Sequence, residues 1–236
     1  MGSAILWGAV AASSLVIGAV AGAVRTWPER WIGLVLAFGA GALISAVSFD
    51  LAQEGAKVGD RGVLGLGLAV GAFTYFAADR LIGKKSARRG DGGQAGTALA
   101  LGAFLDGIPE QLVLGIGIAA GQGVSVGLLV AIFVSNLPEA IGSSTEMRAA
   151  GQSSRSIQRL WVAVAVVCAL ATVGGYAVAD NVGGNFHALV DGFAAGALLV
   201  MLIDSMIPDA TRKGGDVAGL VTVLGFAVAA ALSGIS

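Results

Sequence analysis

Apolar residues fill eight long stretches of the chain, and charged and turn-forming residues fall in the short breaks between them. A helix that crosses a lipid bilayer needs about 20 apolar residues. The stretches therefore predict eight transmembrane helices, over residues 3–24, 32–53, 62–82, 97–120, 123–147, 158–179, 187–208 and 215–235. The breaks are too short for a soluble domain, so we expect one transmembrane domain over residues 1–236.

The composition predicts an all-α integral membrane protein. Hydrophobic residues make up 56% of the chain and charged residues 12%, with a mean hydropathy of +0.85, whereas soluble domains carry about 25% charged residues. The 38 glycines suit helices that pack closely in lipid. No basic residue precedes the first stretch, so we expect a mature helix there rather than a cleaved signal. The single cysteine, Cys168, excludes a disulfide within the chain.

The distribution of Lys and Arg predicts the orientation, because cytoplasmic connections are enriched in these residues. On one side of the predicted helices there are only Lys57 and Arg61. Twelve lie on the other side: Arg25, Arg30, Arg80, Lys84, Lys85, Arg88, Arg89, Arg148, Arg155, Arg159, Arg212 and Lys213. We therefore expect both termini to be extracytoplasmic, in a plasma membrane of bacterial type.

Two of the stretches resemble each other. Phe38–Glu54 reads FGAGALISAVSFDLAQE, and Phe193–Asp209 reads FAAGALLVMLIDSMIPD. The predicted orientation makes these helices antiparallel, and inverted repeats of this kind are typical of transporters. A chance match between two Ala- and Gly-rich helices is the alternative. The central motifs DGIPE and SNLPE form a second antiparallel match, so we expect an inverted 3+2+3 repeat of eight helices.

The two central stretches combine carboxylates with helix-breaking prolines. The fourth contains LDGIPEQLVLG from Leu105, and the fifth contains SNLPEAIG from Ser135. Pro109 and Pro138 each remove a hydrogen bond within a helix, and the freed carbonyls must face protein, water or an ion rather than lipid. Asp106 and Glu110 share one helix face, as do Ser135, Asn136 and Glu139 on the other helix, because residues three or four apart are neighbours.

These polar residues lie at similar predicted depths. At about 1.5 Å per residue, Glu110, Ser135, Asp106 and Glu139 fall within roughly 9 Å of depth. A charge near the bilayer centre costs at least about 2.5 kcal/mol, and neighbouring carboxylates repel one another. A divalent metal ion would resolve both problems, since oxygen ligands suit hard and borderline cations. Protonated or hydrogen-bonded neutral carboxyls are the alternatives.

Three further acids lie within predicted spans: Asp50, Asp191 and Asp204. Each is expected either to line an access path or to bond to a neighbouring helix. Three more, Glu54, Glu146 and Asp209, fall at helix ends, where exposure is the simpler interpretation. Cys168 is more typical of a small packing residue than of a metal ligand.

At the central motifs the chain resembles the ZIP (Zrt/Irt-like) family of divalent metal transporters. The resemblance implies eight spans, outward termini, and a metal site in the fourth and fifth helices. It equates Glu110 and Glu139 with the family's bridging glutamates, and Pro109 and Pro138 with its prolines. Asn136 keeps the asparagine of the second motif. The predicted metal ligands are Asp106, Glu110, Ser135, Asn136 and Glu139; Leu43 and Asp50 match pathway positions, with Asp191 and Asp204 as further pathway candidates.

The chain also departs from the family pattern. Asp106 and Ser135 stand where histidine is usual, Gly107 replaces an asparagine, and Gln111 and Ala140 replace glycines. An all-oxygen site weakens the inference of zinc, which favours nitrogen and sulfur ligands, and leaves manganese or iron open. We expect a non-enzymatic transporter without a resident cofactor, as a homodimer in the lipid bilayer and with no nucleic-acid partner. A non-transporting metal sensor or scaffold is the alternative.

Overall fold

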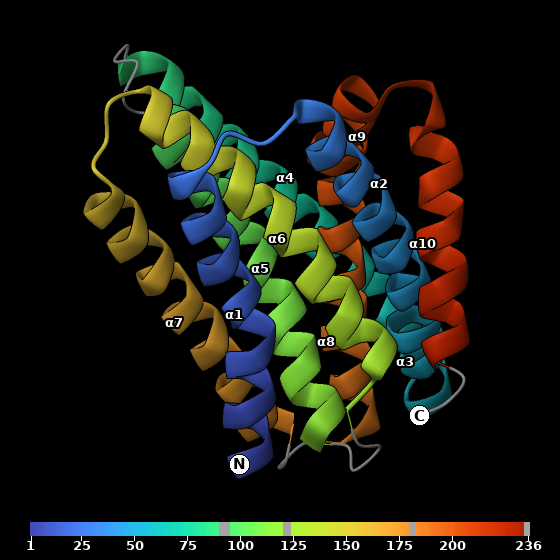
Figure 1. The fold of residues 1–236 in the computed structure, drawn as a ribbon. Coiled ribbons are helices and arrows are strands. Elements are labelled where there is room, and N and C mark those ends of the chain that lie inside the picture. Colours follow the sequence, from blue (N-terminus) through green and yellow to red (C-terminus); the bar gives the residue numbers. More distant parts are fainter. Residues whose placement is uncertain (90–94, 120–123, 180–182, 234–236) are drawn as a thin grey trace.

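The computed structural model is built from helices (Figure 1). It describes the backbone of residues 1–89, 95–119, 124–179 and 183–233, and their side chains except those of 82–89, 95–106 and 179. The α-helices are α1 (Gly2–Val24), α2 (Glu29–Ala46), α3 (Glu54–Val58), α4 (Arg61–Arg89), α5 (Ala95–Ala119), α6 (Val126–Ala149), α7 (Ser154–Ala179), α8 (Gly184–Met201), α9 (Ile207–Gly214) and α10 (Ala218–Ser233). Three short segments of other helix types join them: η1 (Val47–Gln53), η2 (Leu202–Met206) and η3 (Gly215–Val217).

Most of the helices are long and apolar enough to cross a membrane. Within the described residues there are six such segments: Gly2–Val24, Glu29–Val58, Arg61–Leu81, Val126–Ala149, Ser154–Val178 and Gly184–Ser233. The last is 50 residues long and changes direction at Gly215, whose φ of 70° belongs to the left-handed region that favours glycine. The described apolar part of α5 is Gly107–Ala119. The all-helical class predicted from the apolar pattern is confirmed.

The two ends of the bundle differ in what they carry. At one end, called here the terminal end, α1 begins and α10 finishes (Figure 1). At the other, called the basic end, lie the connections from α1 to α2 and from α6 to α7, together with α9 (Figure 1). The helices extend further than the predicted spans: α4 continues to Arg89, and the rod formed by α8, η2 and α9 continues to Gly214.

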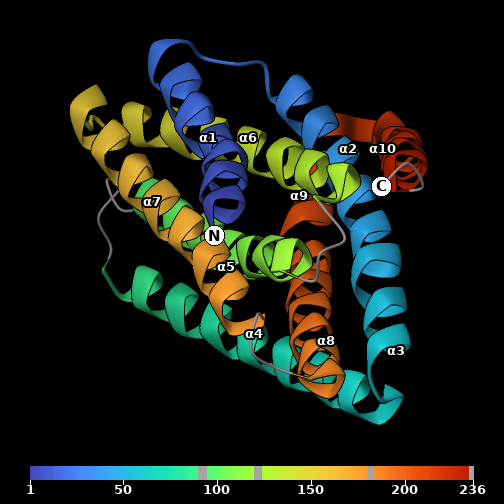
Figure 2. The same cartoon turned by 90° about the horizontal axis from the view of Figure 1, so that it is seen from below.

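α5 lies near the middle of the bundle when it is viewed along its length (Figure 2). It packs against α6, α7 and α8, while α1 packs against α6 and α7 on one side. On the other side α4 lies along α8, and α10 lies along α2. The central pair α5 and α6 is therefore enclosed by helices from both ends of the sequence.

Two helix contacts far apart in the molecule use glycines at matching positions. A Cβ at Gly41 on α2 would lie 1.8 Å from the Thr222 carbonyl oxygen on α10, and a Cβ at Gly196 on α8 would lie 2.0 Å from that of Leu68 on α4. Gly41 and Gly196 are 155 residues apart, the same interval that separates the similar segments at Phe38 and Phe193. Only glycine permits backbones to approach this closely.

The two similar segments also share an irregularity that the apolar pattern did not predict. Both change from α-helix to π-helix, at Val47 and at Leu202, which are again 155 residues apart. Asp50 lies in the first π-helical segment and Asp204 in the second. π-helical turns are rare and are often found at functional sites. The two continuous helical segments that contain them, α2–η1–α3 and α8–η2–α9, are therefore candidates for a functional role and are called the two rods below.

Candidate functional site

A buried polar centre joins α5 to α6. Glu110 on α5 is only 1% exposed, and Ser135 and Asn136 on α6 are equally buried. The Asn136 amide donates from Nδ2 to Glu110 Oε2 at 3.0 Å. Ser135 Oγ lies 3.4 Å from Glu110 Oε1 and 3.0 Å from the Ile132 carbonyl oxygen, so its single proton is shared between two acceptors. Three of the five predicted ligands are thus brought together.

The sequence around each proline explains why these groups face each other. Pro109 and Pro138 lie inside helices that remain continuous, and both are buried. A proline leaves the carbonyl four residues earlier without its helical partner, so this side of each helix is best placed against protein. Glu110 directly follows one proline, and Ser135 and Asn136 precede the other by less than a turn. The polar groups therefore lie where the two helices meet.

The other two predicted ligands are placed less completely. Glu139 is half-buried on α6, four residues after Ser135 and so on the same face. Asp106 lies on α5, but its side chain is outside those that the structure describes. Among the described side chains, no three His, Cys, Asp or Glu residues form a group that could hold a metal ion. Asp106, the third carboxylate of the predicted site, lies outside these described side chains.

The site is closed on one side by α2 and η2. A Cβ at Gly39 on α2 would lie 3.0 Å from Ser135 Cα and 3.4 Å from the Met206 methyl group. Leu43, one turn further along α2, is fully buried. Both π-containing rods therefore lie near the centre. The first contributes Gly39 of α2, which packs against Ser135, and the second contributes Met206 of η2, which packs against Gly39.

Two departures from the family pattern have structural explanations. A Cβ at Gly107 would lie 2.8 Å from Cys168 Sγ on α7, so a larger residue there would require Cys168 or the helix to shift. Gln111 is fully buried and accepts a hydrogen bond at Oε1 from the Thr172 hydroxyl, also on α7. Gln111 therefore ties α5 to α7 rather than joining Glu110, a role that its place beside the motif did not reveal. Cys168 is a buried packing residue, as predicted.

Three acidic residues lie toward the terminal end, on η1, α3 and α8 (Figure 1). Asp191 on α8 is 7% exposed, and a Cβ at Gly55 on α3 would lie 3.4 Å from its Oδ2 atom. Asp50 in η1 accepts a hydrogen bond from Ser233 Oγ at 3.3 Å. Glu54 is close enough to both aspartates to repel them electrostatically. Two of the three predicted pathway acids therefore share Glu54 as a charged neighbour.

The third pathway candidate differs from these two. Asp204 lies in η2 and is exposed, beside Ile203, which is 64% exposed. Of the acids predicted at helix ends, Glu146 is exposed, whereas Glu54 and Asp209 form ion pairs within their own helices, with Lys57 and with Arg212 and Lys213.

Together the bundle and its centre define a class of protein. Ionisable residues inside a membrane bundle are rare and typically mark paths for ions or substrates. The long apolar helices, with a carboxylate enclosed between two proline-containing helices, are therefore typical of an integral membrane protein with an internal polar site.

The relatives found by comparison are named as zinc transporters. No protein-family model matches the chain. A protein of Arabidopsis thaliana named as a candidate zinc transporter is 27% identical over 191 residues, which cover 78% of this chain and 30% of that protein. The zinc transporter SLC39A7 of Homo sapiens is 27% identical over 122 residues, covering 49% of this chain and 26% of that protein. The SLC39A7 protein of Mus musculus is 25% identical over the same length.

The matched regions span less than a third of the length of these curated relatives. The relatives are named as transporters and not as enzymes, in agreement with the prediction of a non-enzymatic protein.

Proposed function

We propose that this chain is a secondary transporter of the ZIP family that moves divalent metal cations, zinc, manganese or iron, toward the cytoplasm. The observation that carries the proposal is the buried Glu110, held by Asn136 and Ser135 where the two Pro-Glu helices meet. The similarity to proteins named as zinc transporters supports the same function. The transporting unit is the single transmembrane domain of residues 1–236.

The donor set suits a divalent cation. The proposed ligands are the carboxylates of Asp106, Glu110 and Glu139, with the Ser135 hydroxyl and the Asn136 amide oxygen. Carboxylate, hydroxyl and amide oxygens are ligands for hard and borderline cations. The hydrogen bonds from Asn136 and Ser135 to Glu110 would be exchanged for bonds to the ion. An all-oxygen set leaves zinc, manganese and iron as candidate cargoes.

The proposed architecture has eight spans in an inverted 3+2+3 repeat. Three observations support the repeat: the matching glycine contacts at Gly41 and Gly196, the two π-helical segments that begin 155 residues apart, and the two Pro-Glu helices packed against each other. Inverted repeats place substrate sites near the bilayer midplane, at discontinuous helices. The centre at Glu110, bordered by both π-containing rods, fits that arrangement.

The proposed path runs from the terminal end to the basic end. The excess of Lys and Arg assigns the basic end to the cytoplasm and both termini to the extracytoplasmic side of a plasma membrane. Asp50, Asp191 and Glu54 would then attract cations at the outer side, since clefts lined by one sign of charge concentrate ions of the other. Asp204 would serve the path from the other π-helical segment. We propose a homodimer as the assembled form.

Uptake into liposomes tests the proposal. The full chain is reconstituted with an internal metal-sensitive dye, and zinc, manganese and iron(II) are supplied separately. We expect uptake of at least one of these ions, and we expect Glu110→Gln to reduce it to the level of empty liposomes. The matched control is Glu146→Gln, which removes an exposed charge from the same helix as Glu139. Full uptake by the Glu110→Gln protein would contradict the proposal.

A further inference from the structure

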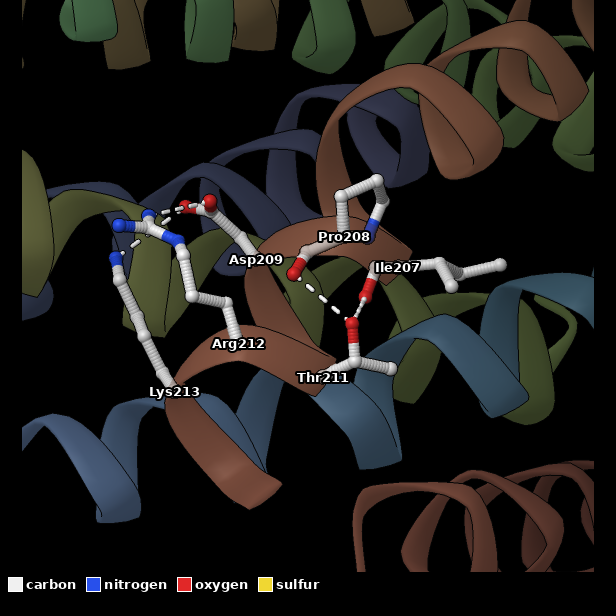
Figure 3. Close-up of polar contacts among 6 residues, drawn as sticks. All are labelled: Ile207, Pro208, Asp209, Thr211, Arg212 and Lys213. Atoms are coloured by element: carbon white, nitrogen blue, oxygen red, sulfur yellow. Dashed lines mark hydrogen bonds and ion pairs between the residues drawn. The ribbon is translucent and has the colours of Figure 1, made fainter. Parts of the chain in front are cut away.

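A second group of charges lies at the basic end, on α9. Figure 3 shows Arg212 and Lys213 both reaching Asp209. Arg212 Nη2 lies 2.6 Å from Asp209 Oδ1, and Lys213 Nζ lies 3.3 Å from Asp209 Oδ2. The carboxylate therefore offers one oxygen to each cation. Sequence alone treats both basic residues as markers of the cytoplasmic side.

The two cations differ sharply in their surroundings. The Arg212 side chain is 69% exposed, and such ion pairs contribute little because water screens them. The Lys213 side chain is only 13% exposed. A Cβ at Gly33 on α2 would lie 2.6 Å from Lys213 Cβ, and a Cβ at Gly142 on α6 would lie 4.0 Å from Lys213 Nζ. Lys213 is thus packed between α2 and α6, and its side chain is far less accessible to water than that of Arg212.

The ammonium group lies on the same face of α6 as the polar centre. Ser135, Glu139 and Gly142 follow one another at intervals of four and three residues, which places them along one face of the helix. Gly142 is three residues beyond Glu139, a rise of roughly 4.5 Å toward the basic end. An ion leaving the centre along this face would meet Lys213 within about one turn of helix.

The matching position in the other rod carries no charge. Glu54 and Lys57 on α3 form an ion pair at 3.0 Å, 155 residues before Asp209 and Arg212. The residue 155 positions before Lys213 is Val58, which is 40% exposed. The repeat therefore accounts for the pair of Asp209 and Arg212, but Lys213 is an addition specific to the basic end.

We infer that Lys213 is the gate of the cytoplasmic exit, an inference that rests on the proposed function. While it pairs with Asp209, the positive charge of this largely covered side chain closes the path between the centre and the basic end. A departing divalent cation takes the place of the ammonium group on Asp209, and the flexible lysine side chain moves toward water. Asp209 Oδ2 thus exchanges the ammonium group for the divalent cation, while Oδ1 keeps its ion pair with Arg212.

Thiol labelling of the exit tests this inference without measuring transport. The full chain carries Gly142→Cys, where Lys213 Nζ at 4.0 Å is the only close neighbour of the new Cβ among the described atoms. A membrane-impermeant maleimide is applied from the cytoplasmic side of inverted membrane vesicles. The chain without Gly142→Cys gives the background, because Cys168 is buried.

We expect adding Lys213→Met to speed labelling about tenfold, as a shift of about 1.4 kcal/mol in a closed–open equilibrium would. The Met side chain keeps most of the apolar stem and removes the charge; Lys213→Gln replaces it if that protein does not fold. Lys213→Arg keeps the charge and is expected to label slowly. Arg212→Met is the matched control, since it removes the exposed partner of the same Asp209, and it should leave the rate within about twofold.

Equal labelling rates with and without Lys213→Met, or the same acceleration from Arg212→Met, would overturn the gate. Metal uptake by the chain with no substitutions is measured in parallel. If no divalent ion is taken up while Lys213→Met still speeds labelling, the proposed function fails and Lys213 remains the residue that closes this end. If uptake occurs and labelling does not change, the transport proposal stands and the gate is wrong.

Discussion

The rods Glu29–Val58 and Gly184–Gly214 carry matching acid–base pairs at opposite ends of the bundle. Glu54 pairs with Lys57 at the terminal end, and Asp209 pairs with Arg212 at the basic end, in both cases three residues apart in the chain. Each rod reaches its pair through a π-helical segment. These shared features are local: each ion pair joins residues of the same rod, so it depends only on the sequence of that rod.

The rods differ in the buried charge that each end adds. At the terminal end Asp191 lies buried against Gly55 of α3. The residue 155 positions earlier, Leu36, is an apolar core residue at the basic end. At the basic end the Lys213 side chain is only 13% exposed, where the other rod has Val58. One end of the bundle thus has a carboxyl group covered by protein and the other a largely covered ammonium group. Under the proposed function, this difference distinguishes entrance from exit.

The largest effect is expected where the two halves match most closely. Gly41→Val and Gly196→Val should each cost well over the roughly 1–3 kcal/mol typical of overpacking, because the new Cβ would meet a backbone oxygen at 1.8 or 2.0 Å. For both variants, we expect the peak of monodisperse protein on size-exclusion chromatography to be much smaller than that of the parent chain. Gly65→Val is the control, since a Cβ there meets nothing within 4 Å. Tolerance of one substitution but not the other would break the structural match between the halves.

The next effect concerns the negative charge at the terminal end. Asp191→Asn should raise the metal concentration for half-maximal uptake about tenfold, equivalent to about 1.4 kcal/mol, with little change in maximal rate. The reason is that the buried carboxylate attracts the ion before it reaches Glu110. Asp60→Asn is the control, because Asp60 is exposed at the same end and Asn preserves its oxygen contact with the Gly62 amide. Equal shifts for both variants would mean that burial of Asp191 has no special effect.

A smaller effect should follow from copying the lysine to the other end. Val58→Lys is expected to slow uptake a few-fold, since a partly exposed charge interacts by about 0.2–1 kcal/mol and Val58 is 40% exposed. Val58→Met, of similar length and without charge, should leave the rate unchanged. Identical rates for the Lys and Met variants would show that a positive charge near Glu54 does not impede the ion.

The smallest effect is expected at the exposed pair. Lys57→Gln should change the free energy of unfolding by less than about 0.5 kcal/mol, because exposed pairs three residues apart contribute little and Lys57 is 59% exposed. Thermal unfolding in detergent measures it. Lys213→Gln in the same assay should exceed that change, and a reversed order would remove the distinction between the two basic residues.

Sequence was sufficient for the features that depend on local pattern. The apolar stretches predicted an all-helical membrane protein, and the similar depths of Glu110 and Ser135 predicted that α5 and α6 meet at these residues. Both follow from the rise and period of a helix. The hydrogen bonds from Ser135 and Asn136 to Glu110 agree with that prediction.

Features set by packing between distant segments were not predictable in the same way. The π-helical segments leave the apolar pattern unchanged, so nothing in their residue types announced them. The sequence placed Lys213 only among the basic residues of the cytoplasmic side, because its packing depends on Gly33 and Gly142, which lie on other helices. Asp191 was a candidate from its place within a predicted span, and Asp50 from its span and the family resemblance, but the interaction of Asp191 with Glu54 emerged only from the fold.

The most direct test of the central claim is calorimetric titration of divalent metal into the purified full chain in detergent. The account predicts saturable binding of zinc, manganese or iron(II) by the chain with no substitutions. It predicts loss of that binding with Glu110→Gln, because one carboxylate of the centre is then missing, and unchanged binding with Glu146→Gln. Metal binding by the Glu110→Gln protein with the affinity and stoichiometry of the parent chain would contradict the claim that Glu110 holds the ion.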